Sequence, residues 1–419
     1  MNNRIENVAL IYLELPDSRP EQDVYELSEL IATAQGRIVL NITQKRNSID
    51  ANTVVGKGKL EEIKNAMDML EDDKKVDVVI FSCNLNSTQR ATLKKTLECD
   101  IIDKFDLILD IFALRATSAE GKKQVELAQL SYNLATKADG DFSRQGAGIG
   151  TRGPGETKLE INKRTARERM YRLRKELEEI EKRREVTRKN RQENDKFTVA
   201  LVGYTNAGKS TLFNLLTNSD IYADDKLFAT LDTTVRKLEI GEGIEILICD
   251  TVGFINDLPH SLLNAFKSTL EEAACADLLL NVCDASDPNV TNHIEVTERT
   301  LAELNTCAPT IRVYNKCDKL SDTANLSSML NERTSSIFVS ALTGKNIDVL
   351  RDKIKDYAMT QYASVLLEFS LSESAKVLSL LNKYATKFSV DYGNESATAE
   401  VVILKKYVNL FAKYLSIKR

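Results

Sequence analysis

The chain has 419 residues, 42% of them hydrophobic and 28% charged, and a formal net charge of −5. This is the composition of a globular protein with two or three domains, and the longest apolar runs are shorter than the roughly 18 residues that a membrane span needs. The cysteines show no C-x-x-C spacing and the two histidines, His260 and His293, lie far apart, so no transition-metal site is expected. The N-terminal residues resemble no export signal, and we expect a cytoplasmic, monomeric protein.

Residues 1–138 alternate short β-branched runs with stretches of helical periodicity. Strands are predicted in ENVALIYLEL, RIVLNITQ, VDVVIFS and DLILDIF, and helices over residues 23–34, 59–70 and 88–97. This alternation predicts an N-terminal α/β domain with a parallel sheet covered by helices. The segment VVGKGKLEEI has glycines and lysines at a helix start. An ordinary strand-to-helix turn is favoured there over an anion or second nucleotide site, because the segment has no G-K-[ST].

Residues 139–195 combine a glycine-rich loop with a long helical stretch. The run DGDFSRQGAGIGTRGPGETK has six glycines, which preclude regular structure, and it carries Arg144 and Arg152. A loop that enters a narrow, phosphate-lined space is therefore favoured over a plain linker. From residue 157 onward, apolar positions at helical spacing predict a helical hairpin or coiled coil. Residues 158–196 hold 15 basic and 9 acidic side chains, a net charge of +6, which is typical of a nucleic-acid-binding surface and also of a solvated helix.

A phosphate-binding motif lies near the start of residues 196–361. The segment GYTNAGKS satisfies G-x-x-x-x-G-K-[ST] between an apolar, β-branched run and a helical stretch. Its backbone N–H groups and the helix N-terminus favour an anion, Lys209 is expected to reach the β- and γ-phosphates, and the Ser210 hydroxyl is expected to ligate Mg²⁺. The residues of this predicted loop are Gly203, Tyr204, Thr205, Asn206, Ala207, Gly208, Lys209, Ser210 and Thr211.

A base-recognition motif, NKCD, follows a later predicted strand. The carboxylate of Asp318 can accept two hydrogen bonds from the N1–H and amino groups of guanine, whereas adenine offers no such donor pair, so GTP and GDP are the expected ligands. The neighbouring residues are expected to brace the loop and cover the base, and a backbone N–H after the next strand to meet the guanine O6. These further predicted contacts are Asn315, Lys316, Cys317, Ser340, Ala341 and Leu342.

Two segments between these motifs are expected to sense the γ-phosphate. In the D-x-x-G segment, the Asp250 carboxylate is expected to hold Mg²⁺ through water and the Gly253 N–H to contact the γ-phosphate. In LFATLDTT, one threonine is expected to complete the Mg²⁺ shell, and residue chemistry alone does not choose among Thr230, Thr233 and Thr234. The remaining predicted positions are Phe228, Ala229, Leu231, Asp232, Thr251 and Val252. Four motifs in this order predict a doubly wound P-loop GTPase domain.

The residue after the D-x-x-G segment is Phe254, where many regulatory GTPases have a glutamine that orients the attacking water. Phenylalanine cannot hydrogen-bond water, so we expect slow intrinsic hydrolysis of GTP to GDP and phosphate, with a partner or an ion supplying the missing element. Asn206 is a candidate to help hold K⁺ beside the phosphates. A role restricted to hydrogen bonds within the loop is equally favoured.

Residues 362–419 contain strand-like runs and two helical stretches, ESAKVLSLLNKYAT and KKYVNLFAKYL. They predict a small C-terminal α/β domain. No motif assigns a duty to it.

These segments together resemble the HflX family of ribosome-associated GTPases over nearly the whole chain. The resemblance rests on VGKGKLEEI, DLILDIFALRA, EGKKQVELAQL, SRQGAGIGTRGPGETKLE, GYTNAGKS, LFATLD, DTVGF and NKCD. It implies that Ser210 and Thr230 are the Mg²⁺ ligands, and we expect Lys209, Thr230 and Gly253 to serve catalysis. It also implies that the protein binds the large ribosomal subunit and its rRNA in the GTP state, with the N-terminal domain and the glycine-rich loop directed toward the peptidyl-transferase region.

Members of this family split or rescue stalled or idle ribosomes, with hydrolysis stimulated by the ribosome, and the resemblance implies the same function here. The segments DKFDLIL, NLNSTQRATL and LATKADGDF depart from the family pattern, which bears on the rRNA contacts and leaves GTP binding unaffected. An alternative function is a GTP-dependent scaffold that acts on a protein partner without splitting ribosomes. A third, an ATP-driven helicase-like activity of the N-terminal domain, would rest on GKGK alone.

Overall fold

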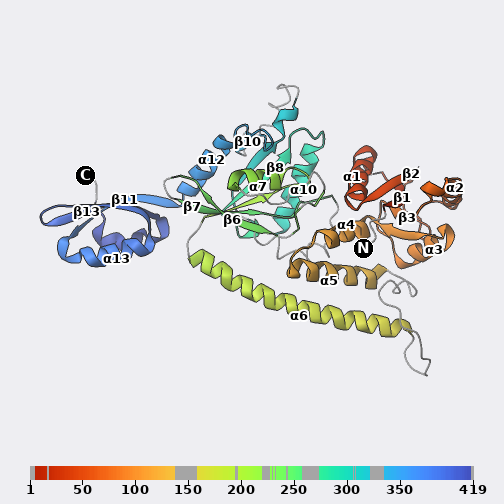
Figure 1. Ribbon diagram of the computed structural model, residues 1–419, viewed down its shortest axis with the longest axis horizontal. Coiled ribbons are helices and arrows are strands. Elements are labelled where there is room, and N and C mark those ends of the chain that lie inside the picture. The colour runs from red at the N-terminus through yellow and green to blue at the C-terminus, as the bar shows by residue number, and fades with distance from the viewer. Residues whose placement is uncertain are drawn as a thin grey trace. The chain divides into compact units, whose positions relative to one another are not determined.

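The computed structural model consists of two compact units, which are described separately (Figure 1). The first comprises Met1–Glu185, Asp224–Asp232 and Val252–Leu270, and the second Val186–Ala223, Thr233–Thr251 and Glu271–Arg419. The structure describes residues 5–16, 18–136, 158–193, 197–218, 227–228, 230–231, 233–241, 244–256, 273–304, 306, 308–320 and 335–416. The glycine-rich run at 139–157, with Arg144 and Arg152, lies outside the described residues, as do Ala229 and Asp232.

The N-terminal domain is built on a four-stranded, fully parallel sheet in the order β2-β1-β3-β4. Its strands are β1 (Glu6–Glu14), β2 (Gly36–Lys45), β3 (Val78–Phe81) and β4 (Asp100–Asp103), and its helices are α1 (Pro20–Thr33), α2 (Lys57–Asp68), α3 (Ser87–Leu97) and α4 (Lys104–Arg115), with a 3₁₀ turn, η1, at Asp72–Lys74. Apolar side chains of β1 and β3 form the centre of the core, among them Ile11 and Phe81, each 1% exposed. The prediction of a parallel sheet covered by helices is confirmed.

The prediction of a last strand in DLILDIF is wrong, because these residues lie in helix α4. The strand before it ends at Asp103, whose side chain accepts a hydrogen bond from the Asp106 N–H at 2.9 Å and so caps the helix. Helix α4 is buried on most of its circumference, including Phe105, Ile108 and Ile111. A short, continuous apolar run does not by itself distinguish a buried strand from a buried helix.

For residues 157–194 the sequence predicted a helical hairpin or a coiled coil, and the hairpin is wrong. Residues 158–193 form a single helix, α6 (Lys158–Glu193), and not two arms. Its partner is α5 (Ala119–Thr136), which lies beside it in Figure 1. Two ion pairs join the helices, Arg169 Nε to Glu126 Oε1 at 2.7 Å and Lys123 Nζ to Glu176 Oε2 at 2.9 Å, and their order shows that the helices run antiparallel. The glycine-rich run therefore connects the two arms along the chain.

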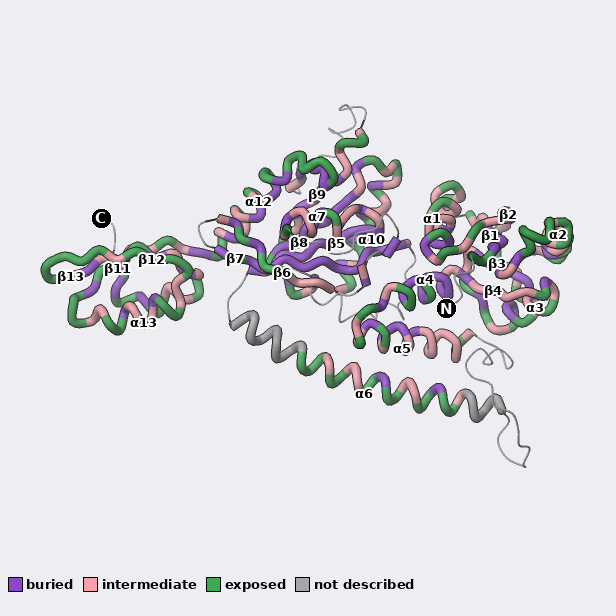
Figure 2. Tube along the Cα trace, viewed as in Figure 1, coloured by how far each residue is buried: buried purple, intermediate pink, exposed green. Residues whose placement is uncertain are grey.

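The GTPase domain is a six-stranded sheet in the order β10-β9-β8-β5-β7-β6, in which only β6 is antiparallel. Its strands are β5 (Thr198–Val202), β6 (Thr234–Glu239), β7 (Glu245–Asp250), β8 (Leu278–Asp284), β9 (Thr310–Asn315) and β10 (Ser336–Phe338), and its described helices are α7 (Lys209–Thr217), α10 (Val290–Glu303) and α12 (Ile347–Met359), with a 3₁₀ turn, η3, at Cys317–Lys319. The central strands β5, β7 and β8 are almost entirely buried (Figure 2). This is the predicted P-loop GTPase fold, and the prediction is confirmed.

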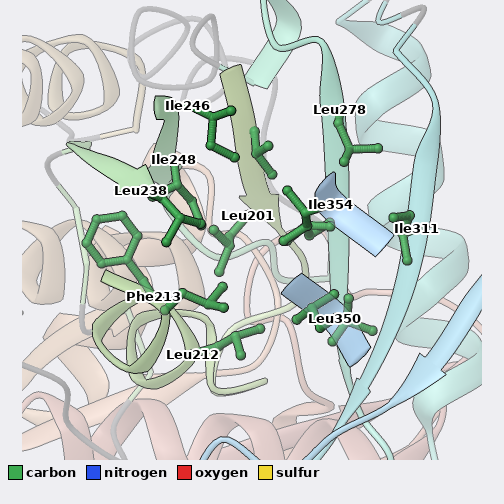
Figure 3. Close-up of a cluster of buried hydrophobic side chains, with 14 of the residues drawn as sticks. Leu201, Leu212, Phe213, Leu238, Ile246, Ile248, Leu278, Ile311, Leu350 and Ile354 are labelled. Atoms are coloured by element: carbon green, nitrogen blue, oxygen red, sulfur yellow. The ribbon is translucent and has the colours of Figure 1, made fainter. Parts of the chain in front are cut away.

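Side chains from the sheet and from the helices of this domain pack together in one core. Leu201 of β5 and Ile248 of β7 lie among Leu212 and Phe213 of α7 and Leu350 of α12 (Figure 3). All five are fully buried. The close packing fixes where strand β5 ends and helix α7 begins, which is the position of the predicted phosphate-binding loop.

The C-terminal domain is a three-stranded antiparallel sheet in the order β11-β13-β12. Its elements are β11 (Tyr362–Ser370), η5 (Leu371–Glu373), α13 (Ser374–Tyr384), β12 (Ala385–Tyr392), β13 (Ser396–Leu404) and η6 (Lys405–Tyr414). The stretch KKYVNLFAKYL, predicted as an α-helix, forms the 3₁₀ segment η6, whose Phe411 and Tyr414 are buried against the sheet. Across the described residues, no helix is long and apolar enough to cross a membrane.

Candidate nucleotide-binding site

The predicted phosphate-binding loop connects the end of β5 to the start of α7. Its first glycine, Gly203, has φ +143°, and a Cβ there would lie 2.2 Å from the backbone oxygen of Val282 in β8. Gly208 has φ +86°, and a Cβ there would lie 2.3 Å from Asn315 Nδ2. Both positions therefore require glycine, because strand β8 and the NKCD segment approach the loop closely.

Lys209 is buried at the start of α7 and closes the loop on itself. Its Nζ donates hydrogen bonds to the carbonyl oxygens of Gly203 at 3.1 Å and Tyr204 at 2.7 Å. Burial lowers the pKa of Lys209 to about 8, and the nearby Asp250 carboxylate opposes that shift. The side chain is thus a buried cation held mainly by neutral carbonyl groups.

Two oxygen ligands of the kind that Mg²⁺ prefers meet beside this lysine. The Ser210 hydroxyl donates to Asp250 Oδ2 at 2.7 Å, and Asp250 is 1% exposed at the end of β7. Hydroxyl and carboxylate oxygens suit a hard divalent cation. The next residue, Thr251, is also buried and donates its hydroxyl proton to the Leu201 carbonyl at 2.6 Å, which anchors the segment to β5.

The NKCD segment is hydrogen-bonded directly to the phosphate-binding loop. Asn315 Nδ2 donates to the Ala207 carbonyl at 3.0 Å, and Asn315 Oδ1 accepts from the Ala341 N–H at 2.9 Å. Lys316 Nζ donates to the Asn206 carbonyl at 2.8 Å and pairs with an oxygen of Asp284 at 2.7 Å. The two residues therefore hold the loop and the segment after β10 in one fixed arrangement.

The carboxylate expected to read the base is accessible. Asp318 is exposed, and a hydrogen bond from the Ser340 side chain lowers its pKa, so it is ionised at neutral pH. Ser340 is itself fully buried, whereas Leu342 is 80% exposed. Cys317, the residue before Asp318, is half-buried, and burial raises its thiol pKa. An ionised, exposed acceptor beside a buried hydroxyl suits recognition of two N–H donors on one base edge.

Of the residues expected to sense the γ-phosphate, Phe228, Thr230 and Gly253 belong to the first compact unit, whereas Asp250 and Thr251 belong to the second. Phe228 is buried with φ +54°, and its ring lies edge-on to Phe112 of α4 with centroids 4.6 Å apart. Lys104 Nζ, at the start of α4, donates to the Asn256 carbonyl at 3.3 Å and to Glu26 Oε1 at 2.8 Å. Helix α4 therefore contacts Phe228, two residues before Thr230, and Asn256, three residues after Gly253. Within these segments Leu231, Val252 and Phe254 are buried and Thr230 is half-buried.

One neighbour of the phosphate-binding loop was not predicted from the sequence. The ring of Tyr204 stacks on His293 of α10, with centroids 3.8 Å apart and planes 10° from parallel. His293 Nδ1 lies 3.6 Å from Asp287 Oδ2. A single histidine in a helix gives no pattern that predicts such a contact, because it depends on how α10 packs beside the loop.

Comparison with known proteins decides the family. The chain is 48% identical over 315 residues to a protein named GTPase HflX from Caldanaerobacter subterraneus, an alignment that covers 74% of this chain and 73% of the relative. It is 41% identical over 350 residues to GTPase HflX of Escherichia coli, covering 82% and 81%. The chain belongs to the GTPase HflX family. The family resemblance noted in the sequence is confirmed, and so is the expectation of a GTPase.

Three regions of this HflX-family chain match models of protein families. Residues 21–113 match the GTP-binding GTPase N-terminal model, residues 115–191 the GTP-binding GTPase Middle Region model, and residues 198–316 the 50S ribosome-binding GTPase model. Among solved structures, a GTP-binding protein from Sulfolobus solfataricus in complex with GDP is 25% identical. Its alignment covers 84% of this chain and 99% of that one at a TM-score of 0.45.

Proposed function

We propose that this HflX-family protein is a GTP-controlled switch that associates with the large ribosomal subunit and its rRNA, and that it splits or rescues stalled or idle ribosomes. The observation that carries the proposal is the direct bonding of Asn315 and Lys316 to the phosphate-binding loop, in a segment that matches a 50S ribosome-binding GTPase model. Such bonding links the guanine contact at Asp318 to the phosphate contact at Lys209. Binding of the base and of the phosphates is then coupled.

In the nucleotide complex we propose, the phosphates take over the hydrogen bonds that Lys209 makes to Gly203 and Tyr204. A buried ammonium group that exchanges neutral carbonyls for phosphate oxygens gains a strong charge-assisted interaction. Ser210 and Thr230 would hold Mg²⁺, with Asp250 acting through water, and the ion would neutralise charge on the β- and γ-phosphates. The Gly253 N–H would contact the γ-phosphate.

Slow intrinsic hydrolysis is part of the proposal. Phe254 is fully buried and has no group that can hold the attacking water. The ribosome would therefore supply the missing element by reordering the segments that carry Thr230 and Gly253. A K⁺ ion at Asn206 would be a second source of positive charge, and rates that are equal in KCl and NaCl would exclude it.

The test is steady-state GTP hydrolysis with and without purified large subunits, together with co-sedimentation in a GTP analogue. The rate is expected to rise with large subunits, and Lys209→Ala is expected to abolish nucleotide-dependent co-sedimentation. Lys319→Ala, at an exposed lysine beside the NKCD segment, is the matched control and should behave like the unmodified protein. Light scattering of intact ribosomes then measures splitting.

The alternative to ribosome splitting is that the protein acts as a GTP-dependent scaffold for a protein partner. A hydrolysis rate that large subunits leave unchanged, together with co-sedimentation that is the same with Lys209→Ala, would favour that scaffold. Cytoplasmic location and a monomeric state complete the proposal, and size-exclusion chromatography with light scattering measures the latter.

A further inference from the structure

The C-terminal domain carries opposite charges on the two faces of its sheet. Leu367 and Val401 point to the covered face, where α13 and η6 pack against the sheet. Their strand neighbours alternate and therefore point to the opposite face. The pairing registers place Thr398 between Glu368 and Asp391, and Glu400 between Leu366 and Ser389, on that opposite face.

The covering elements α13 and η6 form a surface rich in lysine, which we call the lysine layer. With η5, it holds five lysines and one acidic residue, Glu373, a net charge of +4. The opposite face holds Glu368, Asp391 and Glu400 against Lys387, a net of −2. All five lysines of the layer are exposed. They are Lys376, Lys383, Lys405, Lys406 and Lys413.

Tyrosines lie between these lysines. The rings of Tyr384, at the end of α13, and Tyr407, in η6, are in contact with centroids 4.8 Å apart. Lys383 Nζ and Lys406 Nζ each lie 5.1 Å from the centroid of the neighbouring tyrosine ring. Both tyrosines are half-buried, so they pack on the core and still expose part of the ring at the surface. The two elements thus join in a cluster of two aromatic rings flanked by two cations.

We propose that the lysine layer is an RNA-binding surface that contacts the phosphate backbone of an unpaired RNA strand. Lysines that follow the backbone, combined with aromatic rings on which bases stack, are the composition of surfaces that bind single-stranded nucleic acid. Lysine is a point charge without the planar, forked donor geometry of arginine, which suits phosphate contact without base selection. The acidic opposite face repels a polyanion, so RNA would meet the domain from one side only.

An RNA contact made by the C-terminal domain is additional to the GTP switch. It rests on the proposed function only for naming ribosomal RNA as the physiological partner. Binding to RNA itself is a property of the layer's charge, and it is measurable without ribosomes.

The test measures how RNA binding depends on salt concentration in the full-length protein, in a variant of the lysine layer and in a matched control. The variant Lys376→Gln/Lys383→Gln/Lys406→Gln removes three charges from the lysine layer. The matched control, Ser370→Glu/Lys387→Gln/Ser389→Glu, changes the net charge by the same amount at exposed positions on the strands of the opposite face and its edge. Fluorescence anisotropy with a labelled oligouridylate, from low to high KCl, gives the slope of log K against log salt for each protein.

The triple lysine variant is expected to lower the magnitude of that slope by about 2 and to weaken binding at least about tenfold at low salt, since each phosphate contact on a single strand contributes about 0.7. The control should keep the slope of the unmodified protein. An unchanged slope in the lysine variant, or equal losses in both variants, would overturn the proposal.

Co-sedimentation with large subunits separates this proposal from the proposed function. If the unmodified protein fails to sediment with large subunits, the ribosomal function fails and the oligouridylate slopes still decide whether the lysine layer binds RNA. If the lysine variant loses subunit binding but keeps the RNA slope, the layer contacts an acidic protein surface and the RNA proposal is wrong.

Discussion

Two glycines allow the phosphate-binding loop to pass close to other backbone groups. Gly203 combines a φ of +143° with a space that the Val282 carbonyl oxygen already fills. An added methyl group would have to displace the backbone of strand β8, which lies at the centre of the sheet. A substitution at Gly203 is therefore expected to lower the stability of the fold as well as the affinity for the nucleotide.

Gly203→Ala is expected to lower the free energy of unfolding by about 3 kcal/mol or more, because a strained backbone angle and a backbone clash occur at one position. Gly58→Ala is the control. Nothing lies within 4 Å of a Cβ at Gly58, which is helical, so the change should stay within about 1 kcal/mol and on the stabilising side. Urea denaturation followed by circular dichroism measures both, and equal effects would contradict the clash.

We expect Lys209 to make nucleotide binding sensitive to pH. Burial lowers its pKa to about 8 in the free protein, and bound phosphate requires the ammonium form. Affinity for GDP should therefore be nearly constant below about pH 7 and fall as pH rises through 8, reaching about a fourfold loss at pH 8.5. Titration calorimetry in two buffers of different ionisation enthalpy measures both the affinity and the protons taken up. A flat affinity profile without proton uptake would show that Lys209 stays charged in the free protein.

A buried ionic network joins four elements of the N-terminal domain. Arg90 of α3 donates to Asp103 Oδ2 at the end of β4 at 2.9 Å and to Asp106 Oδ2 of α4 at 2.6 Å. Tyr132 of α5 donates its hydroxyl proton to Asp103, and burial, followed by the charge of Asp103, raises the Tyr132 pKa. The network fixes how α4 and α5 leave the sheet, and α4 in turn contacts Phe228 and Asn256.

Arg90→Met is expected to lower the free energy of unfolding by about 3–5 kcal/mol, because it leaves two buried carboxylates without their cation. Lys94→Met on the same helix provides the comparison. Lys94 lies 3.7 Å from Asp100 in an exposed pair, so its replacement should cost less than about 1 kcal/mol. Equilibrium denaturation of both variants tests the difference, and a mild effect of Arg90→Met would mean that the network is not a major source of stability.

The two compact units should respond differently to GDP and GTP. The phosphate-binding loop and the NKCD segment lie in the second unit, whereas the segments around Phe228 and Asn256 lie in the first and contact α4. In hydrogen exchange with mass spectrometry, GDP should protect the segments at 197–218 and 308–320 and leave strands β1 to β4 unchanged. At 100 times Kd, binding adds about 2.7 kcal/mol to the unit that holds the ligand.

A GTP analogue should in addition change exchange in α4, because reordering of the Phe228 segment would alter its contact with Phe112. The variant Phe112→Leu keeps an apolar side chain, although a smaller one, and removes the ring contact, so it should reduce this additional effect. Identical α4 exchange with GDP and with the GTP analogue would contradict a role for α4 in sensing the γ-phosphate.

The family and the P-loop GTPase fold could be predicted from the sequence alone, because they depend on residue types at short, fixed spacings. GYTNAGKS fell between a strand and a helix as predicted, and the parallel N-terminal sheet followed from its alternating pattern. The helical nature of DLILDIF and the pairing of α5 with α6 were decided only by the tertiary structure. Burial on all sides removes the periodicity that separates helix from strand, and pairing depends on contacts between residues far apart in the chain.

Only the tertiary structure shows which residues meet at the candidate nucleotide-binding site. The bonds from Asn315 and Lys316 to the phosphate-binding loop span more than one hundred positions, so short-range patterns identify the two motifs without fixing how they contact each other. The stacking of Tyr204 on His293 has no sequence pattern at all. The separation of acidic and basic faces in the C-terminal domain likewise appears only once strand pairing assigns each side chain to a face, because neighbouring residues of a strand point to opposite sides.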